Sequence, residues 1–391
     1  MINLIPRDHW EFKIKDFFHS IGGIIRPAER NRYLNIGALG QCIPVGTGRA
    51  GLVAAIRALD LPIGAKIAVP LYCCHVVFQA IVTAGCKPCF IDIDPETYCL
   101  CPNDLSKKIS DCAAVIAVHM FGNTCDMINI KSTAQGRPII EDCAQALGSK
   151  INGRPVGTFG DIAFFSFRSG KYVSAGEGGA VYSKHYLAKI GEIISKAPQP
   201  TLLNELSHTL KIHMKSMLRS KPFYGMFGYR LWLFASKRTG PSKNDTCSLR
   251  QIHSSDLNIA NNRLPELHSL IERQRANAFL YSTLLRLGPR MICREKPDTY
   301  YNRYLFPIIF QSQKQRDDMA AFLLSKNIDT MKYLDDIVQA AKKYFGYSGN
   351  CPVGEGLSRK VLIVPSYYSL LESDLKYIAN NMNDGWNRIG K

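Results

Sequence analysis

The sequence predicts an α/β fold in which a mostly parallel sheet is covered by helices on both faces. Between residues 48 and about 185, short continuous apolar runs alternate with segments of helical spacing, which is typical of parallel strands because both of their faces are buried. The length of 391 residues exceeds what one ordinary core accommodates. We therefore expect a large domain over residues 1–245 and a smaller C-terminal α/β domain over residues 246–391.

The elements expected in the large domain follow one another along this stretch. Helical spacing is found at residues 49–59, 73–83, 104–109 and 127–135, and extended runs at residues 66–70, 86–91, 113–119, 138–142, 161–167 and 179–183. Ligands in such sheets gather beyond the carboxyl ends of the strands. Asp142 and Lys171 fall at two of these ends, so we expect them to face one site.

Residues 200–240 form an insertion that breaks the alternation. An apolar stripe with helical spacing is followed by an aromatic cluster over residues 223–234; the stripe consists of Leu203, Leu206, Leu210, Met214 and Met217. We expect it to pack on the large domain or across a dimer, because such stripes are usually core. The basic residues between Lys211 and Arg238 leave peripheral contact with a membrane surface as the alternative.

The C-terminal part is predicted to be a small α/β unit. A long amphipathic helix is expected from Leu257 towards Leu280. Two extended runs and two more helical segments follow it; the strands are residues 304–310 and 360–365, and the helices are residues 315–324 and 372–381.

The formal net charge of +17 raises the question of a nucleic-acid partner, because clustered lysine and arginine bind phosphate backbones. The basic residues are mostly dispersed, with one dense stretch over residues 211–238. This distribution predicts no nucleic-acid binding and favours attraction to anionic small molecules or to a lipid surface.

The thirteen cysteines favour a reducing, cytoplasmic compartment, because the N-terminal residues contain no signal-like apolar region. Cys86-x-x-Cys89 lacks a second pair at zinc-finger spacing, so buried thiols are favoured over a metal site, and we expect no metal. No apolar run reaches the roughly eighteen residues that a membrane span needs.

A strand-terminal acid followed by a strand-terminal lysine suits pyridoxal phosphate. Asp142 closes the run Ile139-Ile140-Glu141-Asp142, and Lys171 ends the polar loop that follows Phe164-Phe165-Ser166-Phe167. The cofactor needs an amine for its aldehyde and an acid that keeps its pyridine nitrogen protonated.

Eight segments in order resemble the DegT/DnrJ/StrS-type sugar aminotransferases, which are fold-type I pyridoxal-phosphate enzymes. They include Gly48-Arg49-Ala50-Gly51-Leu52, Phe90-Ile91-Asp92-Ile93-Asp94-Pro95, Val118-His119-Met120-Phe121-Gly122, Ile140-Glu141-Asp142-Cys143-Ala144-Gln145 and Gly176-Glu177-Gly178-Gly179-Ala180. The similarity is strong over residues 45–185 and looser over residues 250–391. It implies the fold-type I architecture, with a mostly parallel sheet and a smaller C-terminal α/β domain.

The resemblance assigns roles to individual residues. Lys171 matches the family's Schiff-base lysine, where dehydratase members have histidine, so transamination is favoured over dehydration. Asp142 matches the partner of the pyridinium nitrogen, and Gln145 matches a contact near the ring hydroxyl. A solvated loop lysine, a capping acid and ordinary packing are the respective structural alternatives.

The phosphate of the cofactor is expected at the start of the first helix, where N–H groups and the helix dipole favour an anion. Thr47, Gly48 and Arg49 open this helix, and Ser166 matches the family's serine that reaches the same phosphate. Most relatives have serine or threonine in place of Arg49, so its role stays open. A helix cap and a core serine are the alternatives for Gly48 and Ser166.

Two features of the family pattern have no clear counterpart. Relatives stack an aromatic residue on the cofactor ring, but a gapless reading places Cys74 there, with Tyr72 and His75 adjacent. Relatives also supply an asparagine or arginine from the partner subunit. Asn244 and Arg250 are candidates for that position, although neither can be assigned.

The resemblance implies a pyridoxal-phosphate-dependent aminotransferase that forms a homodimer with a shared active site. The implied amino donor is an amino acid, L-glutamate, and the acceptor is a nucleotide-linked keto sugar for surface polysaccharide, lipopolysaccharide or a glycosylated metabolite. A pyridoxal-phosphate-dependent sugar dehydratase and a non-catalytic regulatory protein that binds the cofactor are the alternatives. The sugar, the nucleotide and the aminated carbon cannot be predicted.

Overall fold

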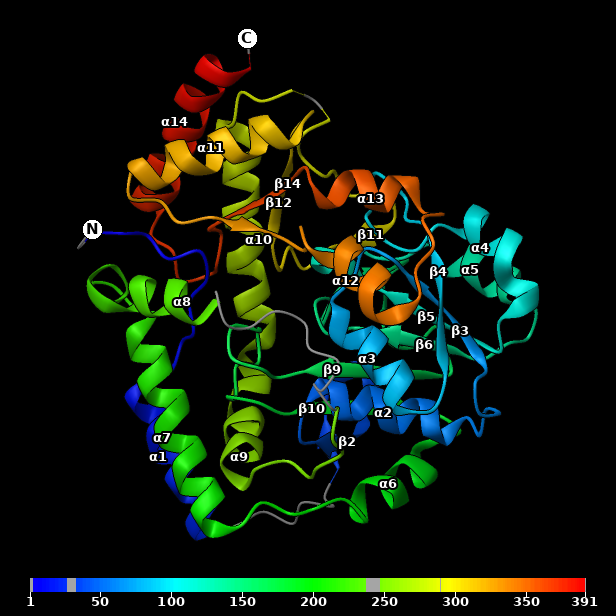
Figure 1. Ribbon diagram of the computed structural model, residues 1–391. Helices are drawn as coiled ribbons and strands as arrows, with labels where there is room; N and C mark the ends of the chain where they lie inside the picture. The colour runs from blue at the N-terminus through cyan, green and yellow to red at the C-terminus, as the bar shows by residue number, and fades with distance from the viewer. Residues whose placement is uncertain (1–2, 27–32, 237–246, 289, 391) are drawn as a thin grey trace.

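Figure 1 shows the computed structural model, which describes residues 3–26, 33–236, 247–288 and 290–390. An eight-stranded sheet forms its centre, in the order β1-β2-β10-β9-β6-β5-β3-β4. The strands are β1 (Leu34–Asn35), β2 (Gln41–Val45), β3 (Lys66–Pro70), β4 (Lys87–Ile91), β5 (Ala114–Val118), β6 (Ile139–Asp142), β9 (Ile162–Ser166) and β10 (Gly179–Ser183). Five neighbouring strands are parallel, namely β9, β6, β5, β3 and β4. The other three, β10, β2 and β1, pair antiparallel to their neighbours. The predicted α/β fold with a mostly parallel sheet is confirmed.

The central strands are buried on both faces, as their continuous apolar runs predict. All five residues of β5 are buried, and so are all four residues of β6, including Glu141 and Asp142. The strand β2 was not among the expected elements. Its run contains Pro44 and begins with the exposed Gln41, and proline inside a run is evidence against a strand when only the sequence is read.

The helices of the large sheet lie close to the predicted positions. They are α2 (Gly48–Ala58), α3 (His75–Thr83), α4 (Pro102–Lys108), α5 (Met127–Ala134) and α6 (Leu187–Ser195). The first four begin and end within two residues of the predicted boundaries, which is the ordinary uncertainty of helix ends.

The long helix expected from Leu257 towards Leu280 is wrong in one respect. The chain forms two helices, α9 (Ser254–Arg263) and α10 (Leu267–Leu284), joined by a 3₁₀ turn over Leu264–Glu266. Pro265 lies in this turn and cannot donate the hydrogen bond that a continuous helix requires. The apolar spacing continues across the break, which is why the sequence reads as one helix.

A second apolar core lies at the C-terminal part of the chain. The antiparallel strands β12 (Phe306–Ile309), β14 (Val361–Val364) and β13 (Met331–Lys332) pack with α11 (Gln313–Ser325) and α14 (Glu372–Ile389), while α12 (Ile337–Phe345) and α13 (Pro352–Ser358) adjoin the large sheet. A further small sheet joins β11 (Thr299–Tyr300), β7 (Lys150–Ile151) and β8 (Arg154–Pro155). The side chain of Ile5 belongs to the second core and that of Ile337 to the first. The division at residues 245 and 246 stays a prediction.

The insertion folds as helices that stand beside the N-terminal helix α1 (Ile14–Ile25). The insertion contains α7 (Leu202–Leu218), a π-helical turn (Tyr224–Gly228) and α8 (Tyr229–Ser236). Figure 1 shows α1 and α7 side by side, and the two helices are in contact. The Arg263 guanidinium and the Asp16 carboxylate, 2.7 Å apart, form a buried ion pair that joins α9 to α1.

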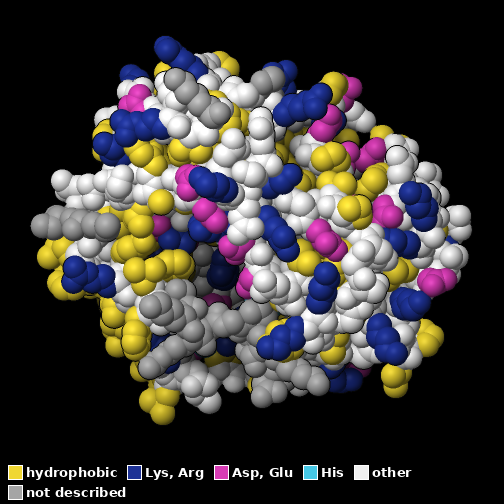
Figure 2. All heavy atoms as spheres, turned by 45° about the horizontal axis from the view of Figure 1, so that its top comes forward, with side chains coloured by type: hydrophobic (Ala, Val, Ile, Leu, Met, Phe, Trp, Pro, Cys, Tyr) yellow, Lys and Arg dark blue, Asp and Glu magenta, His cyan; other side chains and the backbone are white. Residues whose placement is uncertain are grey.

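The apolar stripe of α7 is not core in the described chain. Leu203 is 78% exposed and Leu210 is 68% exposed, so the expectation that these side chains pack on the large domain is wrong. Figure 2 shows apolar side chains gathered along the side on which Figure 1 places α7 and α8, with basic residues dispersed over the rest of this face. Packing against a partner and membrane contact stay as the two interpretations of the stripe.

All thirteen cysteine side chains carry free thiols. None of the helices within the described ranges is both long and apolar enough to cross a bilayer.

We predict that Ile116→Ala destabilises the fold through the central sheet. Ile116 in β5 is fully buried, and removing its side chain leaves a cavity that costs about 2–5 kcal/mol. Ile128→Ala in α5 is the matched control, because Ile128 is 62% exposed. Thermal unfolding should show a clear decrease in midpoint for the first variant only, and equal midpoints would contradict the packing described.

Candidate active site

A cavity of about 400 Å³ opens beyond the carboxyl ends of β6 and β9. All seven residues predicted for the site line it; they are Thr47, Gly48, Arg49, Asp142, Gln145, Ser166 and Lys171. Parallel pairing places Asp142 of β6 opposite Phe164 of β9, so the acid and the lysine loop that follows β9 meet at the same edge of the sheet.

Lys171 is partly buried, and its ammonium nitrogen lies 4.2 Å from the centroid of the Tyr304 ring. Burial and the positive charge of Arg168 lower the pKa of Lys171 to about 7, against the opposing charge of Asp142. The amine is therefore increasingly neutral, and nucleophilic, above pH 7. Arg168 also lines the cavity. Arg168 belongs to the loop that ends at Lys171, but it was not among the predicted site residues.

Asp142 is 6% exposed at the end of β6. Its Oδ1 accepts the Ala144 N–H at 2.9 Å. Burial raises the pKa of Asp142 to about 6, while the Ala144 N–H and the charge of Lys171 oppose this rise. The carboxylate is thus ionised at neutral pH and is suited to hold a cationic ring nitrogen.

The start of α2 forms a cradle for an anion. Thr47 is the N-cap, and its Oγ1 accepts the Ala50 N–H at 3.0 Å. A Cβ on Gly48 would lie 3.1 Å from the Cβ of Ser166, so glycine is what allows β9 to approach the helix start. Arg49 is exposed beside them. These groups converge where the N–H groups and dipole of the helix favour a phosphate.

Gln145 is held by hydrogen bonds at both ends of its side-chain amide. Its Oε1 accepts the Phe121 N–H, and its Nε2 donates to the Tyr333 hydroxyl, each at 3.0 Å. Tyr333 lines the cavity from the C-terminal part of the chain. Tyr333 was not among the predicted site residues, because no motif near residue 333 indicates that this distant segment folds back over the site.

Behind Asp142 lies a buried network centred on Glu141. The Glu141 carboxylate accepts three backbone N–H groups at 2.6–2.7 Å, from Gly157, Phe159 and Gly160. His119 Nε2 lies 3.1 Å from the same carboxylate, and His119 Nδ1 accepts the Cys125 N–H. His119, Glu141 and Cys143 lie close enough to hold a metal ion, but both ring nitrogens of His119 are already engaged. This network instead fixes the end of β6.

The three candidates for stacking on a cofactor ring separate in the structure. Cys74 and His75 line the cavity at the start of α3. Tyr72 does not, because it is fully buried and its hydroxyl donates to the Tyr333 carbonyl at 3.1 Å. Only Cys74 and His75 are therefore placed to cover a ring.

Of the two candidates for a contact from the partner subunit, one lies near this cavity in its own chain. The Arg250 guanidinium forms an ion pair with the Glu177 carboxylate, and Glu177 lines the cavity. Asn244 lies outside the described residues.

The residues of the cavity fit pyridoxal phosphate on three observations. Lys171 offers an amine whose pKa is lowered to about 7, Asp142 offers a buried carboxylate, and Gly48 with Ser166 leaves room at a helix start that another side chain would fill. The cavity volume of about 400 Å³ lies in the range of small-molecule sites.

Comparison with known proteins shows that most of the chain matches one family. The model of the DegT/DnrJ/EryC1/StrS aminotransferase family matches residues 31–195 and 250–383. The match omits residues 1–30, 196–249 and 384–391, and thus the whole of α1, α7 and α8.

Similar proteins include two curated relatives and a solved structure. A GDP-perosamine synthase of Escherichia coli O157:H7 is 26% identical over 368 residues, which cover 93% of this chain and 91% of the relative. A UDP-N-acetyl-3-dehydro-alpha-D-glucosamine 3-aminotransferase of Acidithiobacillus ferrooxidans is 27% identical over 351 residues, which cover 85% and 81%. The structure of Spr1654 from Streptococcus pneumoniae, solved in its PLP form, has a TM-score of 0.74 at 16% identity and covers 99% of both chains.

We predict that Arg168→Gln raises the pKa of Lys171, because it removes a positive charge that opposes protonation of the amine. The pH at which Lys171 begins to react with an amine-modifying reagent should therefore increase. Mass spectrometry of the labelled peptides measures this pH. Arg273→Gln, at an exposed position of α10, is the control and should leave this pH unchanged. An unchanged profile in Arg168→Gln would show that the lowered pKa has another cause.

Proposed function

The chain belongs to the DegT/DnrJ/EryC1/StrS aminotransferase family, and from this premise we propose that it uses pyridoxal phosphate to transfer an amino group from L-glutamate to a nucleotide-linked keto sugar. The observation that carries the proposal is the meeting of Lys171 and Asp142 in one cavity beside the start of α2. The names of the two curated relatives, one a GDP-sugar synthase and one a UDP-sugar aminotransferase, support a nucleotide as the carrier.

Each end of the cofactor would have its own partners. Lys171 would hold the aldehyde end, and Asp142 would pair with the ring nitrogen. Thr47, Gly48 and Ser166 would hold the phosphate at the helix start, with Arg49 adding a positive charge at the cavity edge. Gln145 would lie beside the ring, held in place by Tyr333.

When bound, the cofactor supplies an electron sink that stabilises negative charge at the reacting carbon. The Lys171 Nζ, with a pKa lowered to about 7, is suited both to accept and to return a proton near neutral pH, which is what a single acid–base residue requires. Asp142 stays ionised throughout, because its pKa of about 6 lies below that range. Cys74 and His75 would cover one wall of the site.

Residues of the site argue against both alternatives to transamination, which are a sugar dehydratase and a non-catalytic protein that binds the cofactor. A lysine rather than a histidine at residue 171 argues against a dehydratase, as the resemblance implies. Lys171 and Asp142 together argue against a non-catalytic protein that only binds the cofactor. We propose that the aminated sugar serves a surface polysaccharide, a lipopolysaccharide or a glycosylated metabolite, and that the enzyme acts in the cytoplasm.

Two proposals concern larger partners. The family pattern supports a homodimer with a shared active site. The apolar stripe of α7, in which Leu203 and Leu210 are mostly exposed, supports either packing across that dimer or contact with a membrane. Apolar patches of this kind mark interaction surfaces. Light scattering at increasing concentration tests the dimer, and flotation with liposomes tests the membrane contact.

The decisive experiment adds L-glutamate to the purified protein loaded with pyridoxal phosphate. We expect a shift of the cofactor absorbance, release of 2-oxoglutarate and, with a nucleotide-linked keto sugar, an aminated product. Lys171→Ala should lose more than about 10³-fold of the rate, because the residue that exchanges the proton is gone, and should keep the fold by circular dichroism. Wild-type rates in this variant, or dehydration of the sugar in place of amination, would refute the proposal.

A second prediction concerns Asp142→Asn. The amide keeps the shape of the side chain but lacks the charge that stabilises a protonated ring nitrogen, so we expect cofactor binding to persist while the rate falls by about 10²-fold or more. Equilibrium dialysis measures the binding and stopped-flow absorbance measures the rate with L-glutamate. A normal rate would exclude Asp142 from the mechanism.

A further inference from the structure

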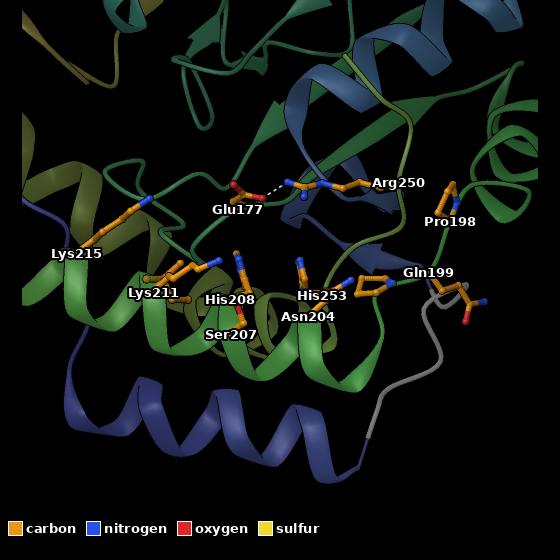
Figure 3. Close-up of a pocket in the computed structure, with 12 residues that line it drawn as sticks. Glu177, Pro198, Gln199, Asn204, Ser207, His208, Lys211, Lys215, Arg250 and His253 are labelled. Carbon is orange, nitrogen blue, oxygen red and sulfur yellow. Dashed lines mark hydrogen bonds and ion pairs between the residues drawn. The ribbon is translucent and has the colours of Figure 1, made fainter. Parts of the chain in front are cut away.

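A second cavity of about 460 Å³ lies between α7 and the segment that precedes α9. Figure 3 shows side chains of α7 pointing from the helix towards Glu177 and Arg250 across this cavity. We call it the α7 pocket. The charged and titratable residues of its lining are Glu177, His208, Lys211, Lys215, Arg250 and His253.

The charge of the α7 pocket is strongly positive. Lys211, Lys215 and Arg250 line it, and Glu177 is the one acidic residue among its described lining. The Glu177 carboxylate is already neutralised by its ion pair with Arg250, so the two lysines are not balanced by an acid of the lining. Concave basic surfaces of this kind concentrate anions.

Two stacked histidines line the pocket beside the lysines. The rings of His208 and His253 lie 4.0 Å apart and are parallel to within 4°. Each is backed by a buried carboxylate, since His208 Nε2 lies 2.9 Å from Asp256 and His253 Nδ1 lies 3.4 Å from Glu205. Burial opposes the charge on His208, but the hydrogen bond and charge of Asp256 outweigh it and raise the pKa of His208.

The spacing along α7 explains why these groups face the same cavity. Asn204, His208, Lys211 and Lys215 line the pocket and recur at intervals of three and four residues, which places them on one face of a helix. The helix lies in the part of the chain that the family model leaves out. The pocket is therefore built largely by a segment that lies outside the family match.

The α7 pocket adjoins the active site through one loop. Glu177 lines both cavities, and it lies on the loop that follows Lys171. The Glu177 N–H donates to Asp256 at 3.1 Å, the same carboxylate that holds His208. One substrate could therefore span the two cavities. Its reacting carbonyl would lie beside Lys171, its anionic group would lie in the α7 pocket, and its middle would lie beside the ion pair of Glu177 and Arg250.

We propose that the α7 pocket binds the diphosphate that links the keto sugar to its carrier. This proposal rests on the proposed function, which requires a carrier with phosphate groups. Lysine and arginine are the common ligands of phosphate, and Lys211, Lys215 and Arg250 converge there from two segments of the chain. Binding here holds the carrier outside the reaction cavity and leaves the sugar free to reach Lys171.

The test compares two double variants of the full chain loaded with pyridoxal phosphate. Lys211→Gln with Lys215→Gln removes two charges from the pocket. Lys107→Gln with Lys131→Gln is the matched control, because it removes two exposed charges on α4 and α5. Isothermal titration calorimetry with GDP, UDP and inorganic diphosphate measures the affinity of each protein. Stopped-flow absorbance with L-glutamate measures the amino-donor half-reaction separately.

The pocket variant should bind GDP or UDP about tenfold or more weakly than the wild type, as the loss of charge-assisted hydrogen bonds predicts, while the control keeps its affinity. The reaction with L-glutamate should be equal in all three proteins. The same pattern with inorganic diphosphate alone would support the phosphate site with a carrier that is not a nucleotide. Equal affinities in all three proteins, or no binding of any probe, would overturn the proposal that the α7 pocket binds the diphosphate. A normal reaction with L-glutamate in the same proteins would leave the proposed function intact.

Discussion

The parallel pairing of β6 with β9 is the constraint on which the candidate active site depends. It sets Asp142 opposite Phe164, so the acid and the loop that carries Lys171 leave the sheet at one edge. The buried network of Glu141 then fixes the end of β6 through three backbone N–H groups. Since an unpaired carboxylate at this depth would be costly, these hydrogen bonds allow two acidic residues in sequence to end a buried strand.

The electrostatics of the site follow from this crowding. Burial raises the pKa of Asp142 and lowers that of Lys171, and Arg168 adds to the second effect. The two pKa values approach neutrality from opposite sides, which leaves an ionised acid and a neutral amine in the same cavity just above pH 7. This is the pair of protonation states that a proton-exchanging lysine with an anionic ring partner requires.

The sequence predicted the parts of the fold that local pattern determines. Buried parallel strands read as continuous apolar runs, so β3, β5 and β6 were predicted to within two residues. Features set by distant contacts were not predictable. The position of Tyr333 depends on how the C-terminal part folds over Gln145, and the exposure of the α7 stripe cannot be read from a periodicity that buried helices share. The break at Pro265 was hidden by apolar spacing that continues through it.

The helix α7 divides its circumference among three environments. One face is buried against the rest of the chain, one lines the α7 pocket, and one is open to solvent; these faces are represented by Thr209, Lys211 and Leu210. Each residue of an α-helix advances by about 100°, so a single inserted or deleted residue would rotate all three faces out of phase at once. The segment therefore tolerates substitution at its open face far more readily than any change of length, and length variants that persist should differ by whole helical turns.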